Sequence, residues 1–152
     1  MTPDVTKGTV ICTNGDSSNT MLRLGGVIPM GVSGFDLSCS AKEFQKLSCS
    51  FVGKNLGYAK DPDLNLDSLK EKYEFVFVNS NGVGATANVF WKGQKIVNAI
   101  SVEIHVAPQW PVSVILQVYE TLNDALPTDS SYITVERVKR PDYKLGTYAK
   151  VA

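Results

Sequence analysis

The sequence predicts a mainly β protein: an antiparallel β-sandwich or flattened barrel with one short helix and an extended C-terminal tail. Apolar and polar residues alternate with period two, turn-forming residues recur at intervals of roughly ten residues, and helical periodicity is nearly absent. The chain has 152 residues, of which 43% are hydrophobic and 20% charged, as in an ordinary globular domain. We therefore expect one β domain over residues 1–140 and an arm over residues 141–152.

The first strands form two predicted pairs. Thr9 to Cys12 is β-prone and is followed by a turn-forming run, Asn14 to Asn19, after which Met21 to Leu24 returns as a second strand. Apolar residues then alternate with Asp or Ser over Phe35 to Cys39, and with Ser over Leu47 to Phe51. Such alternation is typical of half-buried strands, with apolar side chains toward the core and polar ones toward water.

The segment from Leu56 to Lys72 breaks this β pattern. Its last part, Asp67 to Lys72, predicts a short helix with Asp67 as the N-cap. Leu66 stands where a calcium loop needs glycine, and Lys72 stands where it needs glutamate, so we expect a solvated loop and not a calcium site. The oxygen-bearing residues that resemble the start of such a loop are Asp61, Asp63, Asn65 and Asp67.

The second half of the chain predicts further strands. Tyr73 to Val78 and Ala85 to Trp91 flank an Asn81-Gly82 turn and predict a hairpin. Ile100 to Val106 and Val112 to Tyr119 predict another long pair. Thr121 to Ser130 is expected to be a loop or a single helical turn, Tyr132 to Val138 the last strand, and Asp142 to Ala152 an extended tail.

Two stretches, residues 22–53 and 89–120, share an apolar pattern when the chain is aligned with itself at an offset of 67 residues. Gly26 falls on Gly93, the one identity among the pattern positions, and Asp36 falls on Glu103. Each unit predicts strand, glycine turn, strand, wide loop and strand, and two such sheets can bury their apolar faces against each other. The alternative is that any two β meanders share such a pattern, and a sandwich is expected in either case.

The charge and the N-terminus argue against several kinds of partner. Fifteen basic and fifteen acidic residues cancel, so no long-range field favours nucleic acid or an anionic membrane. Met1 to Lys7 lacks the apolar core of a signal peptide, and no apolar run reaches the length of a membrane span. We expect a chain that is soluble and not exported.

The three cysteines, Cys12, Cys39 and Cys49, are odd in number and lack the spacing of a zinc site. We expect buried free thiols, because free cysteine behaves as a small hydrophobic residue. A disulfide between Cys39 and Cys49 is the alternative, since both lie on the apolar side of strands predicted to pair.

No catalytic grouping is evident in the sequence. The single histidine, His105, lies between Ile104 and Val106 and is expected to point outward from its strand, without a nucleophile motif beside it. Asp36 and Glu103 are also predicted to face outward, as solvated carboxylates. We therefore predict no enzyme activity, no catalytic residue, no metal and no cofactor.

The residues that remain as interaction candidates are apolar or aromatic and lie on predicted surfaces. Trp110 stands between two prolines at a hairpin end, where it can anchor a contact or fold back over its own sheet. The strand from Val112 to Tyr119 is apolar on both faces, so the short helix or another subunit should cover the second face. The tail can embrace a neighbour or be disordered. The predicted interaction residues are Trp110, Pro108, Ile115, Tyr119, Tyr143, Leu145 and Tyr148.

The segment from Val89 to Val118 resembles small structural proteins of tailed bacteriophages. The similarity lies in the Lys92-Gly93 turn, the run Ser101 to Ile104 and the return Pro111 to Leu116. It implies a non-enzymatic subunit of a capsid decoration, tail tube or neck assembly, built in the host cytoplasm and located in the virion. Its expected partners are further copies of itself and other virion proteins. The alternative is a carbohydrate-binding or adhesin-type module in which Trp110 and nearby tyrosines stack on sugars.

Overall fold

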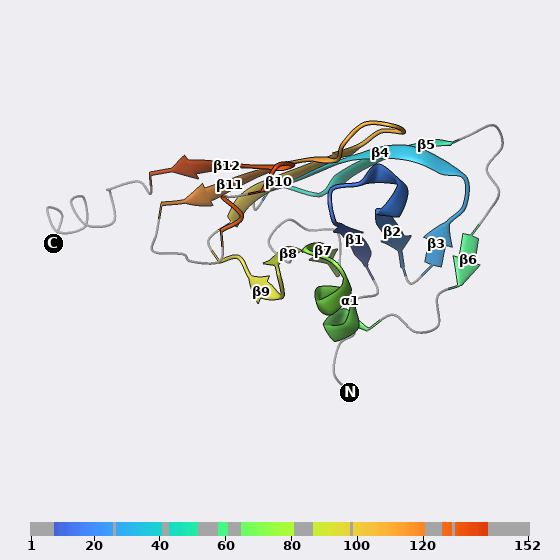
Figure 1. The fold of residues 1–152 in the computed structure, drawn as a ribbon, viewed down its shortest axis with the longest axis horizontal. Coiled ribbons are helices and arrows are strands. Elements are labelled where there is room, and N and C mark those ends of the chain that lie inside the picture. Colours follow the sequence, from blue (N-terminus) through green and yellow to red (C-terminus); the bar gives the residue numbers. More distant parts are fainter. Residues whose placement is uncertain are drawn as a thin grey trace, which may run out of the picture.

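The protein is a sandwich of two β-sheets with one α-helix, as expected from the sequence (Figure 1). The structure, a computed structural model, describes residues 8–25, 27–40, 43–51, 58–60, 65–80, 87–97, 99–120, 126–128 and 130–139. In Figure 1 the strands of one sheet run across those of the other. The predicted arm, residues 141–152, and the Asn81-Gly82 turn lie outside the described residues.

The larger sheet has seven strands in the order β6-β3-β2-β1-β7-β8-β9. The smaller sheet has five in the order β12-β11-β10-β4-β5. The larger sheet consists of β1 (Thr9–Thr13), β2 (Met21–Leu24), β3 (Val27–Pro29), β6 (Tyr58–Lys60), β7 (Phe75–Asn79), β8 (Ala87–Trp91) and β9 (Gln94–Lys95). The smaller sheet consists of β4 (Val32–Ser40), β5 (Lys46–Phe51), β10 (Ala99–Val106), β11 (Ser113–Tyr119) and β12 (Ile133–Val138).

The main core lies between the two sheets and follows from the period-two alternation. Ile11 and Phe77 are paired across β1 and β7 and are fully buried. Leu37 and Ile104 are paired across β4 and β10 and are also fully buried. All four belong to one cluster of buried side chains, so the apolar faces of the two sheets seal each other from water.

The two central strands of the larger sheet are buried on both faces. Val10 and Val76 point away from the main core into a second cluster that includes Leu69 of helix α1 (Leu66–Lys72). The helix therefore covers the outer face of the larger sheet. Its N-cap is Asn65, whose side chain accepts hydrogen bonds from the backbone N–H groups of Asp67 and Ser68. The expectation that Asp67 is the cap was wrong by two residues, because Asn65 is the last extended residue before the helix.

The predicted strand pairs are antiparallel neighbours, as expected. They are β1 with β2, β4 with β5, β7 with β8, and β10 with β11. One part of the antiparallel prediction was wrong, because β12 runs parallel to β11. Tyr73 caps the helix C-terminus and does not begin β7, which starts at Phe75. Three short strands, β3, β6 and β9, were not predicted.

The two pattern units occupy matching places around the centre of each sheet. Leu37 and Ile104, which are 67 residues apart, lie directly opposite each other in the central pair of the smaller sheet. The register of β4 with β5 shifts between Val32 and Gly34, and that of β10 with β11 shifts between Ala99 and Ser101, again 67 residues later. This arrangement agrees with a duplicated unit, and the common origin of the two units stays a prediction.

The three cysteines are free thiols, as predicted, and Cys12 and Cys39 are buried, whereas Cys49 is only half-buried. Burial raises the pKa of Cys12 to about 12, so this thiol stays protonated at neutral pH. Cys49 lies opposite Phe35 and not opposite Cys39. Four residues along a strand correspond to about 13 Å, which is too far for the alternative Cys39–Cys49 disulfide.

Candidate interaction surface

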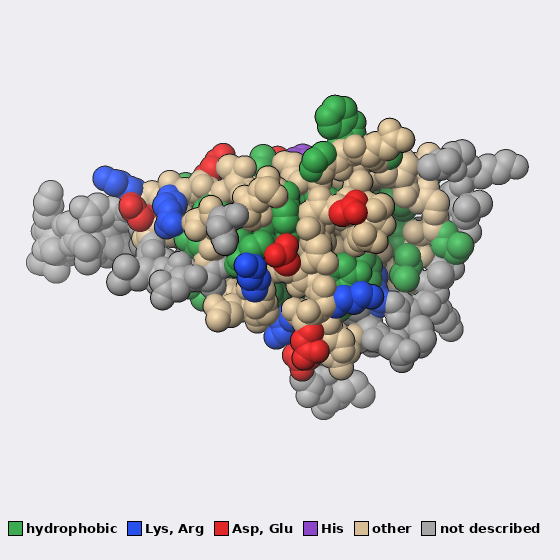
Figure 2. All heavy atoms as spheres, in the orientation of Figure 1, with side chains coloured by type: hydrophobic (Ala, Val, Ile, Leu, Met, Phe, Trp, Pro, Cys, Tyr) green, Lys and Arg blue, Asp and Glu red, His purple; other side chains and the backbone are tan. Residues whose placement is uncertain are grey.

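The outer face of the five-stranded sheet is polar. Its central strands present alternate residues of β4 and β10 to solvent, among them Asp36, Ser38, Glu103 and His105. Figure 2 shows acidic and basic side chains interspersed over the visible face of the molecule, without a patch of a single sign. This distribution agrees with the fifteen basic and fifteen acidic residues of the sequence.

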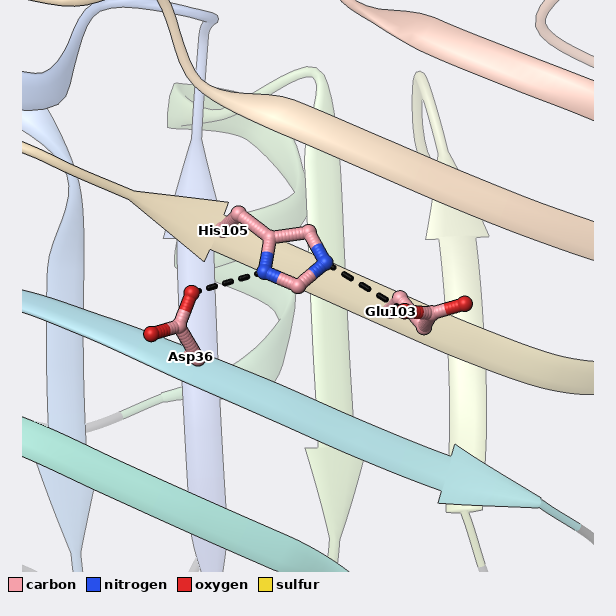
Figure 3. Close-up of polar contacts among 3 residues, drawn as sticks. All are labelled: Asp36, Glu103 and His105. Carbon is pink, nitrogen blue, oxygen red and sulfur yellow. Dashed lines mark hydrogen bonds and ion pairs between the residues drawn. The ribbon is translucent and has the colours of Figure 1, made fainter.

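A histidine held between two carboxylates is the best-defined polar cluster on this face (Figure 3). The Nδ1 atom of His105 lies 2.7 Å from Oδ1 of Asp36 on the neighbouring strand β4. Its Nε2 atom lies 3.3 Å from Oε1 of Glu103 on its own strand. Both ring nitrogens face acceptors, which only the doubly protonated imidazolium satisfies. The hydrogen bond to Asp36 is the main cause that raises the pKa of His105 above its ordinary value, with a smaller contribution from Glu103.

We predict that Asp36→Asn lowers the pKa of His105, and that Glu103→Gln lowers it less because the second contact is longer. An NMR titration of the His105 ring measures both changes.

Because the folded-state pKa is raised, the stability contributed by the charged imidazole is present in full below about pH 6.5 and disappears as pH rises through that raised pKa. Between the ordinary pKa of a carboxyl group, about 4, and the raised pKa of His105, the wild-type protein should therefore unfold with a higher free energy than Asp36→Asn, and the difference should vanish at high pH. The difference should be small, about 0.2–1 kcal/mol, because the pair is exposed. An unchanged pKa in Asp36→Asn would contradict the cluster.

The three members of the cluster are partly exposed. Asp36 and His105 also line a small pocket of about 250 Å³, together with Pro108 of the following loop. In the described part of the chain, the side-chain hydrogen bonds of His105 go to the carboxylates of Asp36 and Glu103. No group of three or more His, Cys, Asp or Glu side chains among the described residues could hold a metal ion.

Two predicted interaction residues, Ile115 and Tyr119, lie on this same outer face toward its β12 edge. Ile115 faces Thr134 and Tyr119 faces Val138 across β11 and β12, and both are half-buried. Of the two predicted covers for this face, the short helix was wrong, because α1 packs on the other sheet. A hydrogen-bonded row crosses the face beside them: the Ser101 hydroxyl contacts Oε1 of Gln117, and Nε2 of Gln117 donates to Glu136.

The loop between β10 and β11 contains two further predicted interaction residues, Pro108 and Trp110. Trp110 is 71% exposed and Pro108 is also exposed, so the tryptophan does not fold back over its own sheet. The loop closes through a bond from Trp110 N–H to the Ala107 carbonyl oxygen, at 3.3 Å, and its base is tied to the β1–β2 loop by a bond from Val112 N–H to the Gly15 carbonyl oxygen, at 3.1 Å. An exposed tryptophan on an anchored loop is suited to insertion into a partner.

Further exposed apolar side chains were not singled out from the sequence. Phe44, just before β5, is 75% exposed, and Phe51 at the end of β5 is 37% exposed. Both belong to the edge of the five-stranded sheet, where β5 pairs on one side only among the described residues. Alternation alone could not identify this edge, because it does not give the strand order. The remaining predicted residues, Tyr143, Leu145 and Tyr148, lie outside the described residues.

A groove of about 560 Å³ opens at one end of the sandwich, between the β1–β2 loop and the start of β4. It brings Asp16 and Lys72 to its rim but contains none of the predicted interaction residues. Among the described residues, no helix is long and apolar enough to cross a membrane. Comparisons with protein-family models, with curated proteins and with solved structures found no match to this chain.

Proposed function

We propose that this protein is a non-enzymatic structural subunit that acts through protein–protein assembly. The proposal rests mainly on β5, which forms the edge of its sheet among the described residues. Six residues, Lys46 to Phe51, form a strand with a partner on one side only in the described part of the chain. An edge strand exposes backbone N–H and C=O groups that readily pair with another chain. Natural proteins usually shield such edges with proline, charge or bulges. β5 carries one lysine and no proline, and the register shift in its pairing with β4 lies at its C-terminal end, opposite Ser50 and Phe51.

The anchored loop provides a second contact of the same kind. Trp110 offers a large apolar surface that loses little conformational freedom when it binds, because the residues on either side of it are fixed in a turn. Phe44 adds another exposed aromatic side chain next to the open edge. Together these features favour association with protein over chemistry at a cleft.

The resemblance of Val89 to Val118 to small structural proteins of tailed bacteriophages supports a location in the virion. Capsid decoration, tail tube and neck components all assemble as repeated copies, and closed or helical arrays use one surface patch many times. We therefore propose a homo-oligomeric virion component, assembled in the host cytoplasm, whose partners are copies of itself and other virion proteins. Enzyme activity, a cofactor, a membrane and nucleic acid have no part in this proposal.

The alternative is a carbohydrate-binding module, which the exposed indole of Trp110 also favours. Sugar binding by stacking requires an accessible aromatic face. The other tryptophan, Trp91, is buried beside Tyr132, with ring centroids 6.2 Å apart, and provides no such face. A glycan array with the wild-type chain and Trp110→Ala separates the two functions: sugar binding that Trp110→Ala abolishes would favour the module.

We also propose that the C-terminal arm embraces a neighbouring copy, and deleting residues 142–152 tests this role. The deletion leaves every described strand intact, so the free energy of unfolding should stay the same while self-association weakens. Sedimentation velocity measures association and urea denaturation measures folding. A truncated chain that unfolds would contradict an arm outside the domain, and unchanged association would remove the arm from the assembly.

A further inference from the structure

The five-stranded sheet ends in two open edges that match in length and in the faces they present. β5 and β12 have six residues each, and among the described residues β5 pairs only with β4 and β12 only with β11. We propose that β5 of one copy pairs with β12 of the next copy, so that the five-stranded sheets of neighbouring copies form one continuous sheet. This inference rests on the proposed function and adds the surface by which the copies meet.

The sheet order determines the direction of this pairing. β4 is antiparallel to β5 and to β10, β10 is antiparallel to β11, and β12 is parallel to β11. β5 and β12 therefore run in opposite directions. When two copies lie side by side with their core faces on the same side, β5 of one meets β12 of the other as an antiparallel pair. That is the more stable kind of pairing, and it keeps apolar residues facing apolar residues.

One register of β5 against β12 places chemically complementary side chains opposite each other. When Lys46 lies opposite Glu136 on the polar face, Ser48 lies opposite Thr134. Leu47 then lies opposite Val135 and Cys49 opposite Ile133 on the core face. Leu47, Cys49 and Val135 are partly buried and pack against the same core cluster, at its two rims. The pairing would bury these rims against each other and place unlike charges directly across the strands.

Pairing between identical edges lacks this complementarity. Lys46 is the one ionised side chain on β5, so β5 against β5 pairs no unlike charges. On β12, Glu136 and Arg137 project from opposite faces and cannot meet in β12 against β12. The Glu136 carboxylate is also held in place for a contact with Lys46. Gln117 Nε2 donates to Oε2 of Glu136 at 3.0 Å and keeps this side chain on the polar face. A head-to-tail contact is therefore favoured, and such contacts produce rings or filaments.

Disulfide trapping tests the contact with the full chain. Ser48→Cys combined with Thr134→Cys places thiols at two exposed positions that face each other only between copies. Within one chain β5 and β12 are separated by four strand spacings, about 19 Å, which is beyond disulfide range. Mild oxidation should give a ladder of covalent dimers, trimers and larger species on a non-reducing gel. Each single variant should give no ladder, and a mixture of the two should stop at dimers. The native Cys49 is present in every variant, so the single variants also measure any cross-linking through Cys49.

Charge exchange gives an independent readout. Lys46→Glu and Glu136→Lys should each weaken self-association, by about threefold to tenfold, because each places like charges opposite each other. A mixture of the two variants should associate like the wild type, since both contacts between unlike variants again pair Glu with Lys. This rescue is specific to a head-to-tail contact.

The outcomes separate this inference from the proposed function. A chain that self-associates without a ladder would retain the assembly function and overturn the β5–β12 contact. Dimers from Ser48→Cys alone would show β5 against β5 and would also overturn it. A chain that stays monomeric would contradict both.

Discussion

Phe77→Ala is expected to lower the free energy of unfolding by about 3–5 kcal/mol, the cost of removing a large buried side chain. Phe77 is fully buried at the centre of the larger sheet, between Ile11 and Val89 on the neighbouring strands. The loss combines the transfer of the ring to water with the cavity that it leaves. Because natural domains are stable by about 5–15 kcal/mol, the variant should be close to unfolding. Guanidinium denaturation measures the change.

Phe44→Ala is the matched control, since it makes the same chemical change at a ring that is 75% exposed. It should change the free energy of unfolding by no more than about 0.5 kcal/mol. If the two variants lost similar stability, the assignment of Phe77 to a core shared by both sheets would be wrong.

Gly34→Ala should be destabilising by about 1–3 kcal/mol, the usual cost of overpacking. A Cβ atom at this position would lie 2.5 Å from the carbonyl oxygen of Val106, at the place where β4 passes β10. The obstacle is backbone, so no side chain can rotate away to relieve it. The two strands must separate and weaken the central pairing of the smaller sheet, which thermal denaturation should record as a lower Tm.

Ser38→Ala is the comparison for this variant, because Ser38 lies four residues along the same strand and is exposed. Its replacement should leave Tm almost unchanged. A Gly34→Ala protein as stable as Ser38→Ala would contradict the close approach of β4 and β10.

The sequence predicted the sandwich because the alternation of apolar and polar residues shows that one face of each strand is buried. The buried faces of the two sheets form the core. The run Phe35 to Cys39 places its apolar residues in the core, and Leu47 and Cys49 pack against it, whereas Phe51 is exposed. The strands β3, β6 and β9 were missed because two or three residues are too few to show a period. The parallel direction of β12 was missed because periodicity is the same in both directions.

Only part of the candidate surface was predictable, because alternation within a strand gives neither the register nor the order of the strands. The outward orientation of His105, Asp36 and Glu103 followed from alternation, but their contact depends on the register of β4 with β10. Trp110 was identified as a candidate contact residue because it stands between two prolines, and its side chain is exposed in the structure. The positions of β5 and β12 at the edges of the sheet, as far as the chain is described, depend on strand order, which is set by long-range packing and leaves no local signal.

The molar mass of the unmodified chain in solution, measured by light scattering over a range of concentrations, shows whether the protein self-assembles. Assembly through the sheet edges predicts a mass that rises with concentration above that of one chain, 16.5 kDa, and reaches a ring or a filament. A mass of one chain at every concentration would contradict a self-assembling subunit.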